Sequence, residues 1–205
     1  MKVIVIGATG TIGSAVADAL EARQHEVVRA ARRGPVRVDM TDADSIDALF
    51  TTAGRTGPVD AVVCCAASGG LTPLDTASDT DFWRGMDGKL TGQVNLVRRA
   101  LSQLRDEGSI TLSSGQFPGP VPGSSMTYLI NSALEAFVHP ASVELPRGLR
   151  LNTVSPGWVR ETLVSLGMDP AGGTPAAEVA RRYVDAVEGT AQGRTLTIPS
   201  GEERP

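Results

Sequence analysis

The sequence KVIVIGATGTIG, residues 2–13, decides the fold. Residues 3–6 are a wholly apolar run of β-branched residues, which predicts a strand buried on both faces inside a parallel sheet. Gly7, Gly10 and Gly13 follow at intervals of three. Residues 14–23 then predict a helix, because their apolar positions recur at helical spacing. The stretch therefore predicts a strand, a glycine turn and a helix in direct succession.

Each glycine of the turn has a separate physical task. Gly7 permits a sharp turn at the carboxyl end of the strand, Gly10 lets the backbone come close to a phosphate, and Gly13 lets the helix pack against the strand. The helix amino terminus offers unpaired N–H groups and a partial positive charge to a pyrophosphate. The G-x-x-G-x-x-G pattern is therefore typical of dinucleotide binding, and three turn glycines in an ordinary α/β domain are the alternative.

The composition bounds the function classes. A chain of 205 residues with 41% hydrophobic residues can build one domain with an ordinary core. With a net charge of −4 and no basic stripe, we expect neither nucleic acid nor a membrane as the main partner. The adjacent Cys64 and Cys65 indicate reduced thiols and a cytoplasmic location. The apolar run at residues 2–6 is too short for a signal peptide or a membrane span, and no cluster with metal-ligand spacing occurs.

The rest of the chain alternates strands with helices. Strands are expected at 25–32, 36–40, 59–70 (with its loop), 108–114, 149–155 and 195–198, and the main helices at 41–53, 86–105, 126–145 and 176–188. Thr41 is expected to cap the first of these helices, and Pro140 to kink or split the third. The pattern predicts an α/β, Rossmann-type, doubly wound parallel sheet of about seven strands in a single domain, 1–205, with helices on both faces. Ligands then bind beyond the carboxyl ends of the strands.

The end of the second strand predicts the cofactor. About 20 residues past the glycines, an acidic residue would bind the ribose 2′-hydroxyl of NAD(H). Arg32 stands in this neighbourhood instead, and a guanidinium suits a 2′-phosphate. NADP(H) is therefore preferred over NAD(H), with a pair of solvated arginines as the alternative. Asp39, at the end of the third strand, is placed to touch the adenine.

Several further segments resemble the short-chain dehydrogenase/reductase family over essentially the whole chain. They are VDMTD (38–42), CCAA (64–67), LTG (90–92), GSI (108–110) with Ser113 and Ser114, ALEAF (133–137), VEL (143–145) and LNTVSPG (151–157). The glycine spacing is nearer the extended or atypical branches of that family. The chain is short for the family, and the missing residues come from the substrate side, at about 157–190.

The family resemblance implies a catalytic set of Asn, Ser, Tyr and Lys, with Tyr and Lys four residues apart. Aligning the helix markers without a gap puts Thr127 at the Tyr position and Asn131 at the Lys position. Ser114 keeps the Ser position, and Lys89 stands at the Asn position. The chain thus resembles a subgroup without the usual active-site pair. Tyr128 lies next to the Tyr position and is a second candidate for the acid.

The resemblance, together with the glycine turn and the small residues after the fourth strand, implies a set of cofactor-binding residues. They are Gly7, Thr9, Gly10, Thr11, Ile12, Gly13, Arg32, Asp39, Met40, Cys65, Ala66, Ala67, Asn131, Pro156 and Gly157. Family members commonly form dimers through two long helices, here 86–105 and 126–145, and often tetramers. We therefore expect a homodimer or homotetramer that acts on a small-molecule substrate.

Three functions remain open at this point. The first is an oxidoreductase with a rearranged relay, in which Asn131 binds the nicotinamide ribose, Ser114 polarises a carbonyl, and Lys89 or Tyr128 supplies the proton. The second is a non-redox enzyme in which Lys89 and Ser114 carry acid–base chemistry. The third is a nucleotide-binding or partner-binding module without turnover.

Overall fold

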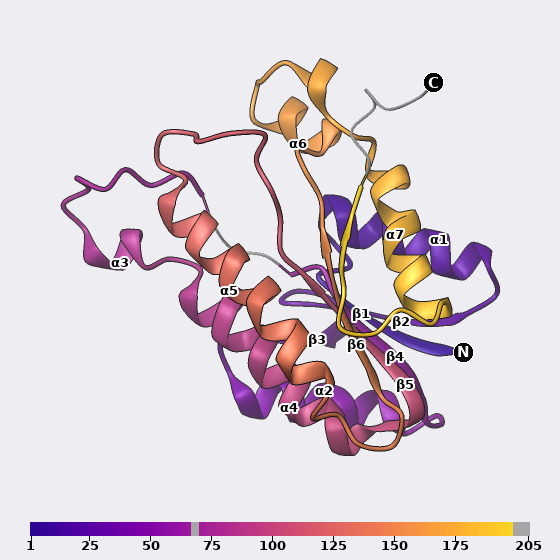
Figure 1. Ribbon diagram of the computed structural model, residues 1–205. Helices are drawn as coiled ribbons and strands as arrows, with labels where there is room; N and C mark the ends of the chain where they lie inside the picture. Colours follow the sequence, from indigo (N-terminus) through magenta and orange to yellow (C-terminus); the bar gives the residue numbers. More distant parts are fainter. Residues whose placement is uncertain (67–69, 199–205) are drawn as a thin grey trace.

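The computed structural model describes residues 1–66 and 70–198, and its centre is one parallel sheet (Figure 1). The seven strands lie in the order β3-β2-β1-β4-β5-β6-β7, and all neighbours pair in parallel. The strands are β1 (Lys2–Ile6), β2 (Glu26–Ala31), β3 (Val36–Arg37), β4 (Val59–Cys64), β5 (Leu104–Ser113), β6 (Arg150–Ser155) and β7 (Thr195–Thr197). The expected doubly wound Rossmann-type sheet is confirmed.

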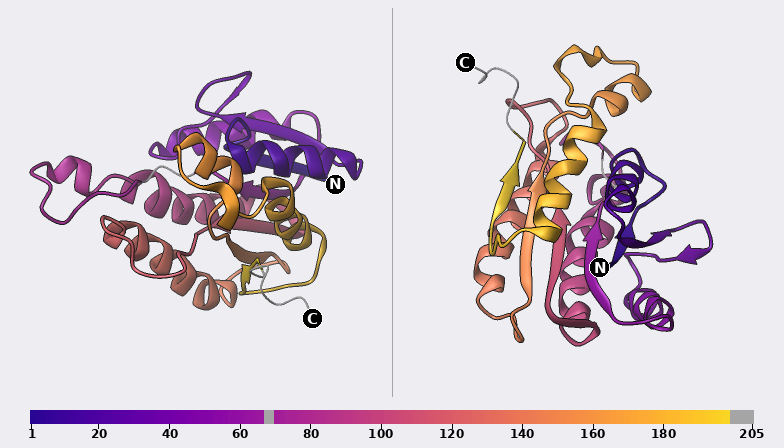
Figure 2. Two further views of the ribbon diagram at one scale, coloured as in Figure 1. Left: turned by 90° about the horizontal axis from the view of Figure 1, so that it is seen from above. Right: turned by 90° about the vertical axis from the view of Figure 1, so that its right-hand side faces the viewer.

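Helices cover both faces of this sheet (Figure 2). α1 (Thr11–Ala22) and α7 (Ala176–Glu188) pack together over one face, and α2 (Ala43–Gly54), α4 (Gly92–Gln103) and α5 (Ser125–Ser142) cover the other. Four short elements complete the chain: α3 (Asp79–Phe82), the π-helical turn η1 (Met86–Thr91), α6 (Arg160–Ser165) and the 3-10 turn η2 (Pro170–Gly172).

β1 explains why the opening run has to be wholly apolar. Val3 and Val5 belong to the core under α1 and α7, whereas Ile4 and Ile6 belong to the core under α2, α4 and α5. Successive side chains of a strand point to opposite faces, so a strand covered on both sides needs apolar residues at every position. All four side chains are buried.

Two local expectations about the second βα unit are wrong. β3 ends at Arg37, so Asp39 and Met40 lie in the loop that follows the strand and not inside it. Asp42, not Thr41, caps α2, since its side chain accepts a hydrogen bond from the backbone N–H of Asp44 at 2.9 Å. The Thr41 hydroxyl donates to Asp39 at 2.8 Å instead.

The expected helix over residues 86–105 begins with an irregular turn and ends early. η1 is a π-helical turn, a rare geometry often found at functional sites, and α4 continues from it to Gln103. Gly92 lies at the junction, where a Cβ would overlap the carbonyl oxygen of Met40. β5 then starts at Leu104, earlier than expected.

The expected split of the next helix at Pro140 is wrong, because α5 runs unbroken from Ser125 to Ser142. Pro140 falls in the last turn, on an exposed stretch where water can satisfy the carbonyl that loses its intrahelical bond. The proline therefore costs little at this place.

The residues expected to form the shortened substrate side, about 157–190, fold as α6, η2 and α7. Figure 1 shows α6 beyond the carboxyl edge of the sheet, whereas α7 returns along the sheet beside α1. Across residues 1–66 and 70–198, no helix combines the length and the apolar character that crossing a membrane requires.

Candidate functional site

The glycine turn at the carboxyl end of β1 is as crowded as its sequence requires. Gly7 has φ 82°, and a Cβ on it would lie 2.7 Å from the backbone nitrogen of Ala66. A Cβ on Gly13 would overlap the carbonyl oxygen of Gly7. Gly10 precedes α1, and no side chain of the described residues caps this helix. The first-turn amides therefore stay available for an anion.

A cavity of about 560 Å³ opens directly in front of this turn. Its size falls in the range of small-molecule and cofactor sites. Eight of the predicted cofactor residues line it: Gly7, Thr9, Gly10, Arg32, Asp39, Met40, Cys65 and Ala66. Six further lining residues were not predicted: Ile6, Ala31, Arg33, Val38, Thr41 and Gly88.

The other predicted cofactor residues lie around the cavity and not in its lining. They are Thr11, Ile12 and Gly13 in the first turn of α1, Asn131 on α5, and Pro156 and Gly157 after β6. Ala67 lies outside the described residues. All the placed ones are at the carboxyl edge of the sheet, as the topology requires.

The end of the cavity next to β2 carries two positive side chains. Arg32 and Arg33 follow the last residue of β2, and both are exposed. Asp39 also lines the cavity, and its carboxylate accepts hydrogen bonds from the backbone N–H of Thr41 at 2.9 Å and from its hydroxyl at 2.8 Å. These bonds, and then the charge of Arg32, lower the pKa of Asp39.

Lys89 brings a buried amine to the same edge of the sheet. It belongs to η1, directly after the cavity residue Gly88, and is 8% exposed. Its Nζ donates to the carbonyl oxygen of Ser114 at 3.3 Å. Burial lowers the pKa of Lys89 to about 8, while Cys64 and Glu135 oppose the shift. The amine therefore titrates near neutral pH.

A half-buried carboxylate joins the carboxyl ends of β5 and β6. Oε1 of Glu135, on α5, accepts a hydrogen bond of 2.7 Å from the Ser114 hydroxyl and another of 2.7 Å from the Ser155 hydroxyl. Both serines are buried. Ser114 is thus bonded through its side chain to Glu135 and through its carbonyl oxygen to Lys89.

Asn131 carries an unsatisfied acceptor in this neighbourhood. Its Nδ2 donates to the carbonyl oxygen of Gly115 at 2.7 Å. Its Oδ1 is buried and has no hydrogen-bond partner among the described residues. Buried polar atoms are nearly always paired, so this oxygen suits a ligand that brings a hydroxyl, such as the ribose of a nucleotide. The crowded glycines and this oxygen both fit a dinucleotide.

Thr127 and Tyr128 use their hydroxyls elsewhere in this structure. Thr127 donates to the carbonyl oxygen of Gly70 at 3.0 Å, and Tyr128 donates to that of Gly119 at 2.9 Å. The Tyr128 ring packs against Phe117, with centroids 5.2 Å apart. The structure therefore brings together Lys89, Ser114 and Asn131, and turns the two remaining candidates towards loops.

Gln93, from α4, fastens the Lys89 turn to β5. Its Nε2 donates to the carbonyl oxygens of Lys89 at 2.9 Å and of Ser113 at 3.0 Å, and its Oε1 accepts from the Ser113 N–H at 2.8 Å. Gln93 and Glu135 were both missed as site residues in the sequence. Their spacing could have identified them, because residues four apart lie on the same face of a helix. Gln93 is four residues after Lys89, and Glu135 is four residues after Asn131.

The two cysteines are free thiols: Cys64 is buried, and Cys65 is half-buried and lines the cavity. Burial raises the pKa of Cys64 to about 12, so this thiol is neutral at pH 7. The described residues contain no group of three or more His, Cys, Asp or Glu residues that could hold a metal ion.

Comparison with known proteins adds a family match. A family model described as Enoyl-(Acyl carrier protein) reductase matches residues 7–183. A curated relative, the (5R,7aS)-5-hydroxy-7a-methyl-1-oxo-2,3,5,6,7,7a-hexahydro-1H-indene-carboxyl-CoA reductase of Mycobacterium tuberculosis (strain ATCC 25618 / H37Rv), is 29% identical over 128 residues. The match covers 60% of this chain and 49% of the relative, so the chain spans about half of that protein.

Solved structures resemble this chain over nearly its full length. The protein lin1944 from Listeria innocua is 37% identical with a TM-score of 0.88, and the match covers 97% of this chain and 100% of that one. A small-chain dehydrogenase in complex with NADPH is 25% identical with a TM-score of 0.82, and the match covers 98% of this chain and 97% of that one.

Proposed function

Because this chain belongs to the short-chain dehydrogenase/reductase family of oxidoreductases, we propose that it interconverts a carbonyl group and an alcohol of a small molecule, with NADP(H) as cofactor. The observation that carries the proposal is the buried amine of Lys89. It lies beside Ser114 at the carboxyl edge of the sheet, directly after a residue that lines the nucleotide cavity.

The choice of NADP(H) rests on the charge at the end of β2. Arg32 and Arg33 line the cavity where an acidic residue would otherwise bind a ribose 2′-hydroxyl. A guanidinium can bind a 2′-phosphate through two parallel hydrogen bonds. The relative of known structure that holds NADPH adds support from the family.

The chemistry assigned to the chain is proton transfer and positioning, whereas the nicotinamide supplies or accepts the hydride. In the reducing direction, the Lys89 ammonium donates a hydrogen bond and then a proton to the substrate oxygen. In the oxidising direction, the neutral amine accepts the proton of the alcohol. Asn131 accepts a hydrogen bond from the nicotinamide ribose through Oδ1. A pKa of about 8 suits an acid and base that works near neutral pH.

The pH dependence follows from this assignment. Reduction needs the ammonium form, so its kcat/KM is expected to fall as the pH rises through about 8. Oxidation needs the neutral amine, so its kcat/KM is expected to rise over the same range. Opposite pH profiles for the two directions, measured on one substrate pair, test the role of Lys89.

The cofactor is tested by calorimetric titration with NADPH and NADH. We expect tight binding of NADPH and weak binding of NADH, with the preference reduced in Arg32→Ala. Arg55→Ala is the matched control, because Arg55 follows α2 and does not line the cavity. Binding of neither nucleotide would contradict the proposal.

The proton donor is tested on any carbonyl substrate that a screen with NADPH yields. Lys89→Met is expected to abolish turnover, and Tyr128→Phe to preserve it, because the Tyr128 hydroxyl is bonded to a loop carbonyl. Loss of turnover in Tyr128→Phe alone would move the acid role to Tyr128.

A second candidate function is non-redox acid–base catalysis in the same pocket. It is favoured by the same Lys89 amine, which in its neutral form is a competent base near pH 8. Product formation without any change in nicotinamide absorbance would identify it.

A further inference from the structure

Glu135 and its two serines form a closed set of hydrogen bonds next to the proposed proton donor. A single oxygen, Oε1, accepts from Ser114 and from Ser155, each at 2.7 Å. The two serines end adjacent strands, β5 and β6, so the carboxylate ties the strand ends to α5. Glu135 also lies one helical turn after Asn131 on α5.

These bonds determine whether the Ser114 hydroxyl can donate a hydrogen bond to a ligand or only accept one. A carboxylate has no proton to give, so both serine hydroxyls must donate to it. Each hydroxyl has one proton. For Ser114 the other acceptor within reach is the carbonyl oxygen of Val154 at 3.5 Å, and the shorter contact of 2.7 Å assigns the proton to Glu135. What Ser114 presents to a ligand is an acceptor, and polarising a carbonyl oxygen requires a donor.

The charge of Glu135 also acts on Lys89. Glu135, from α5, and Lys89 both contact Ser114, which donates its hydroxyl to Glu135 at 2.7 Å and accepts from Lys89 through its carbonyl oxygen at 3.3 Å. The other titratable group near the amine is the Cys64 thiol, from β4. Cys64 is buried and neutral at pH 7. Asp87, on the same turn as Lys89, is exposed to solvent. Glu135 is thus the negative charge that favours the ammonium form against the cost of burial.

We propose that Glu135 is a positioning residue: it accepts the hydrogen bond of the Ser114 hydroxyl and favours the ammonium form of Lys89, so that Lys89 and not Ser114 donates to the substrate oxygen. This inference rests on the proposed function. In reduction, the bound NADPH would supply the hydride to the carbonyl carbon and be oxidised to NADP⁺, Lys89 would give its proton to the oxygen, and the neutral amine would regain a proton from water.

The chain offers a direct measurement of this coupling, because its only two lysines are Lys2 and Lys89. Protein labelled with ¹³C at the lysine Cε gives two side-chain signals, and Lys2→Arg assigns them. The titration midpoint of Lys89 is then read by NMR, without substrate or cofactor.

Glu135→Gln keeps the shape of the side chain and removes its charge. We expect the Lys89 midpoint to fall, since the negative charge that favours the ammonium form is removed. Ser155→Ala is the matched control, because it removes one of the two bonds and leaves the charge, and we expect an unchanged midpoint. An unchanged midpoint in Glu135→Gln would overturn the proposal.

Two further variants keep the test decisive. Glu135→Asp retains the charge and shortens the reach, so we expect a midpoint near that of the wild type even if the protein melts earlier. A Glu135→Asp midpoint as low as that of Glu135→Gln would overturn the assigned charge. In the activity assay, Ser114→Ala is expected to reduce kcat less than tenfold; a loss as large as that in Lys89→Met would return the donor role to Ser114.

The NMR titration and the turnover of Lys89→Met together distinguish an error in the Glu135 coupling from an error in the proposed function. If Glu135→Gln leaves the Lys89 midpoint in place while Lys89→Met abolishes turnover, only the coupling is wrong. If the midpoint moves but Lys89→Met keeps full turnover, Lys89 is not the proton donor, and the role assigned to Glu135 falls with it.

Discussion

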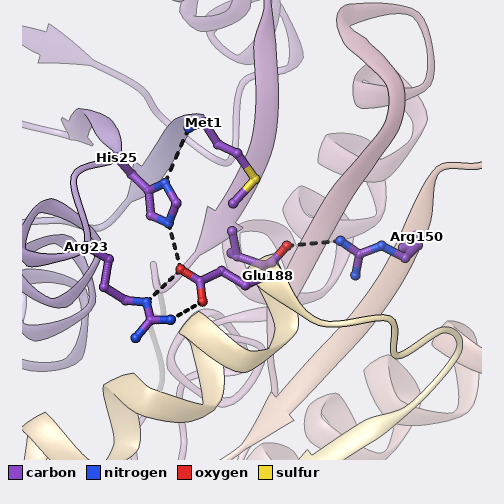
Figure 3. A network of polar contacts seen from close by, with 6 residues as sticks. Met1, Arg23, His25, Arg150 and Glu188 are labelled. Carbon is purple, nitrogen blue, oxygen red and sulfur yellow. Dashed lines mark hydrogen bonds and ion pairs between the residues drawn. The ribbon is translucent and has the colours of Figure 1, made fainter.

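The polar groups at the two ends of the sheet differ in how completely they are hydrogen-bonded. At the carboxyl end, the Lys89 amine is buried with one carbonyl partner, and Asn131 Oδ1 has no partner among the described residues. At the amino end, Glu188 accepts two hydrogen bonds from Arg23, at 2.6 and 2.5 Å, and one from His25, at 2.8 Å (Figure 3).

The amino end extends this network to the first residue and to β6. The ammonium of Met1 contacts Nδ1 of His25 at 3.3 Å, and Arg150 donates to the carbonyl oxygens of Ala186 and Val187, at 3.0 Å each. Most of these polar groups thus have partners within the chain and fasten α1 and α7 to the starts of strands. Two of the unpaired buried oxygens of the described residues, in Thr111 and Thr153, lie within β5 and β6, whereas Asn131 Oδ1 lies at the carboxyl end, where a ligand can pair with it.

The glycine turn is expected to show the largest effect of all. Gly13→Ala places a Cβ on the Gly7 carbonyl oxygen, so we expect a loss of about 4 kcal/mol or more, or no folded protein. Gly54→Ala, at the carboxyl end of α2, is the control: no heavy atom of the described residues lies within 4 Å of the new Cβ. We expect a gain of up to about 1 kcal/mol there. Urea unfolding compares the two, and equal midpoints would refute the packing role of Gly13.

Lys89→Met is expected to lower the activity and to raise the stability. We expect kcat/KM for reduction to fall about 10²-fold or more.

The effect on stability follows from the pKa of Lys89, which is lowered to about 8 in the folded state. The unfolded chain therefore binds more protons between pH 8 and 10.5, and the free energy of unfolding rises with pH across that window. Met removes this dependence and stabilises the protein at pH 7 by up to about 3 kcal/mol. Urea midpoints from pH 7 to 10 measure it, and a less stable variant would contradict the burial cost.

Asn131→Ala should weaken nucleotide binding without lowering the stability of the fold. We expect the Kd for NADPH to rise about tenfold, because the ribose loses its acceptor. Asn152→Ala is the comparison, since its amide donates to Ala191 at 2.7 Å and accepts from the Arg194 N–H at 3.1 Å. That variant should melt earlier and bind NADPH unchanged. If Asn131→Ala instead melts earlier and binds NADPH unchanged, the Asn131 amide stabilises the fold and does not bind the nucleotide.

Glu188→Gln is expected to have the smallest effect, about 1 kcal/mol at pH 7, with activity unchanged. Its hydrogen bonds to Arg23, and then to His25, lower the pKa of Glu188 to about 2. The stabilisation is therefore present above about pH 4.5 and is lost as the pH falls towards 2. Asp185→Asn, which breaks only an exposed pair with Arg182, should cost almost nothing. Acid unfolding of the three proteins tests this, and parallel curves for Glu188→Gln and wild type would contradict it.

The parallel sheet, the alternation of strands with helices and the glycine turn were predictable from the sequence, because each depends on local periodicity or on residues close in the chain. The limits of elements were less predictable. Thr41 and Asp42 are both good helix caps, and only the hydrogen bond of Thr41 to Asp39 decides between them. Pro140 reads as a helix breaker, and its position in a last exposed turn makes it harmless.

The sequence alone determined a nucleotide-binding α/β fold, because a buried strand, three spaced glycines and an amphipathic helix are neighbours in the chain. It also predicted a changed set of site residues, made up of Lys89, Ser114, Thr127 and Asn131. Only the tertiary structure placed Glu135 under Ser114 and Ser155, and joined Glu188 to Arg23 across the chain. Such pairs depend on which strands and helices end side by side, and burial then decides how strongly their charges interact.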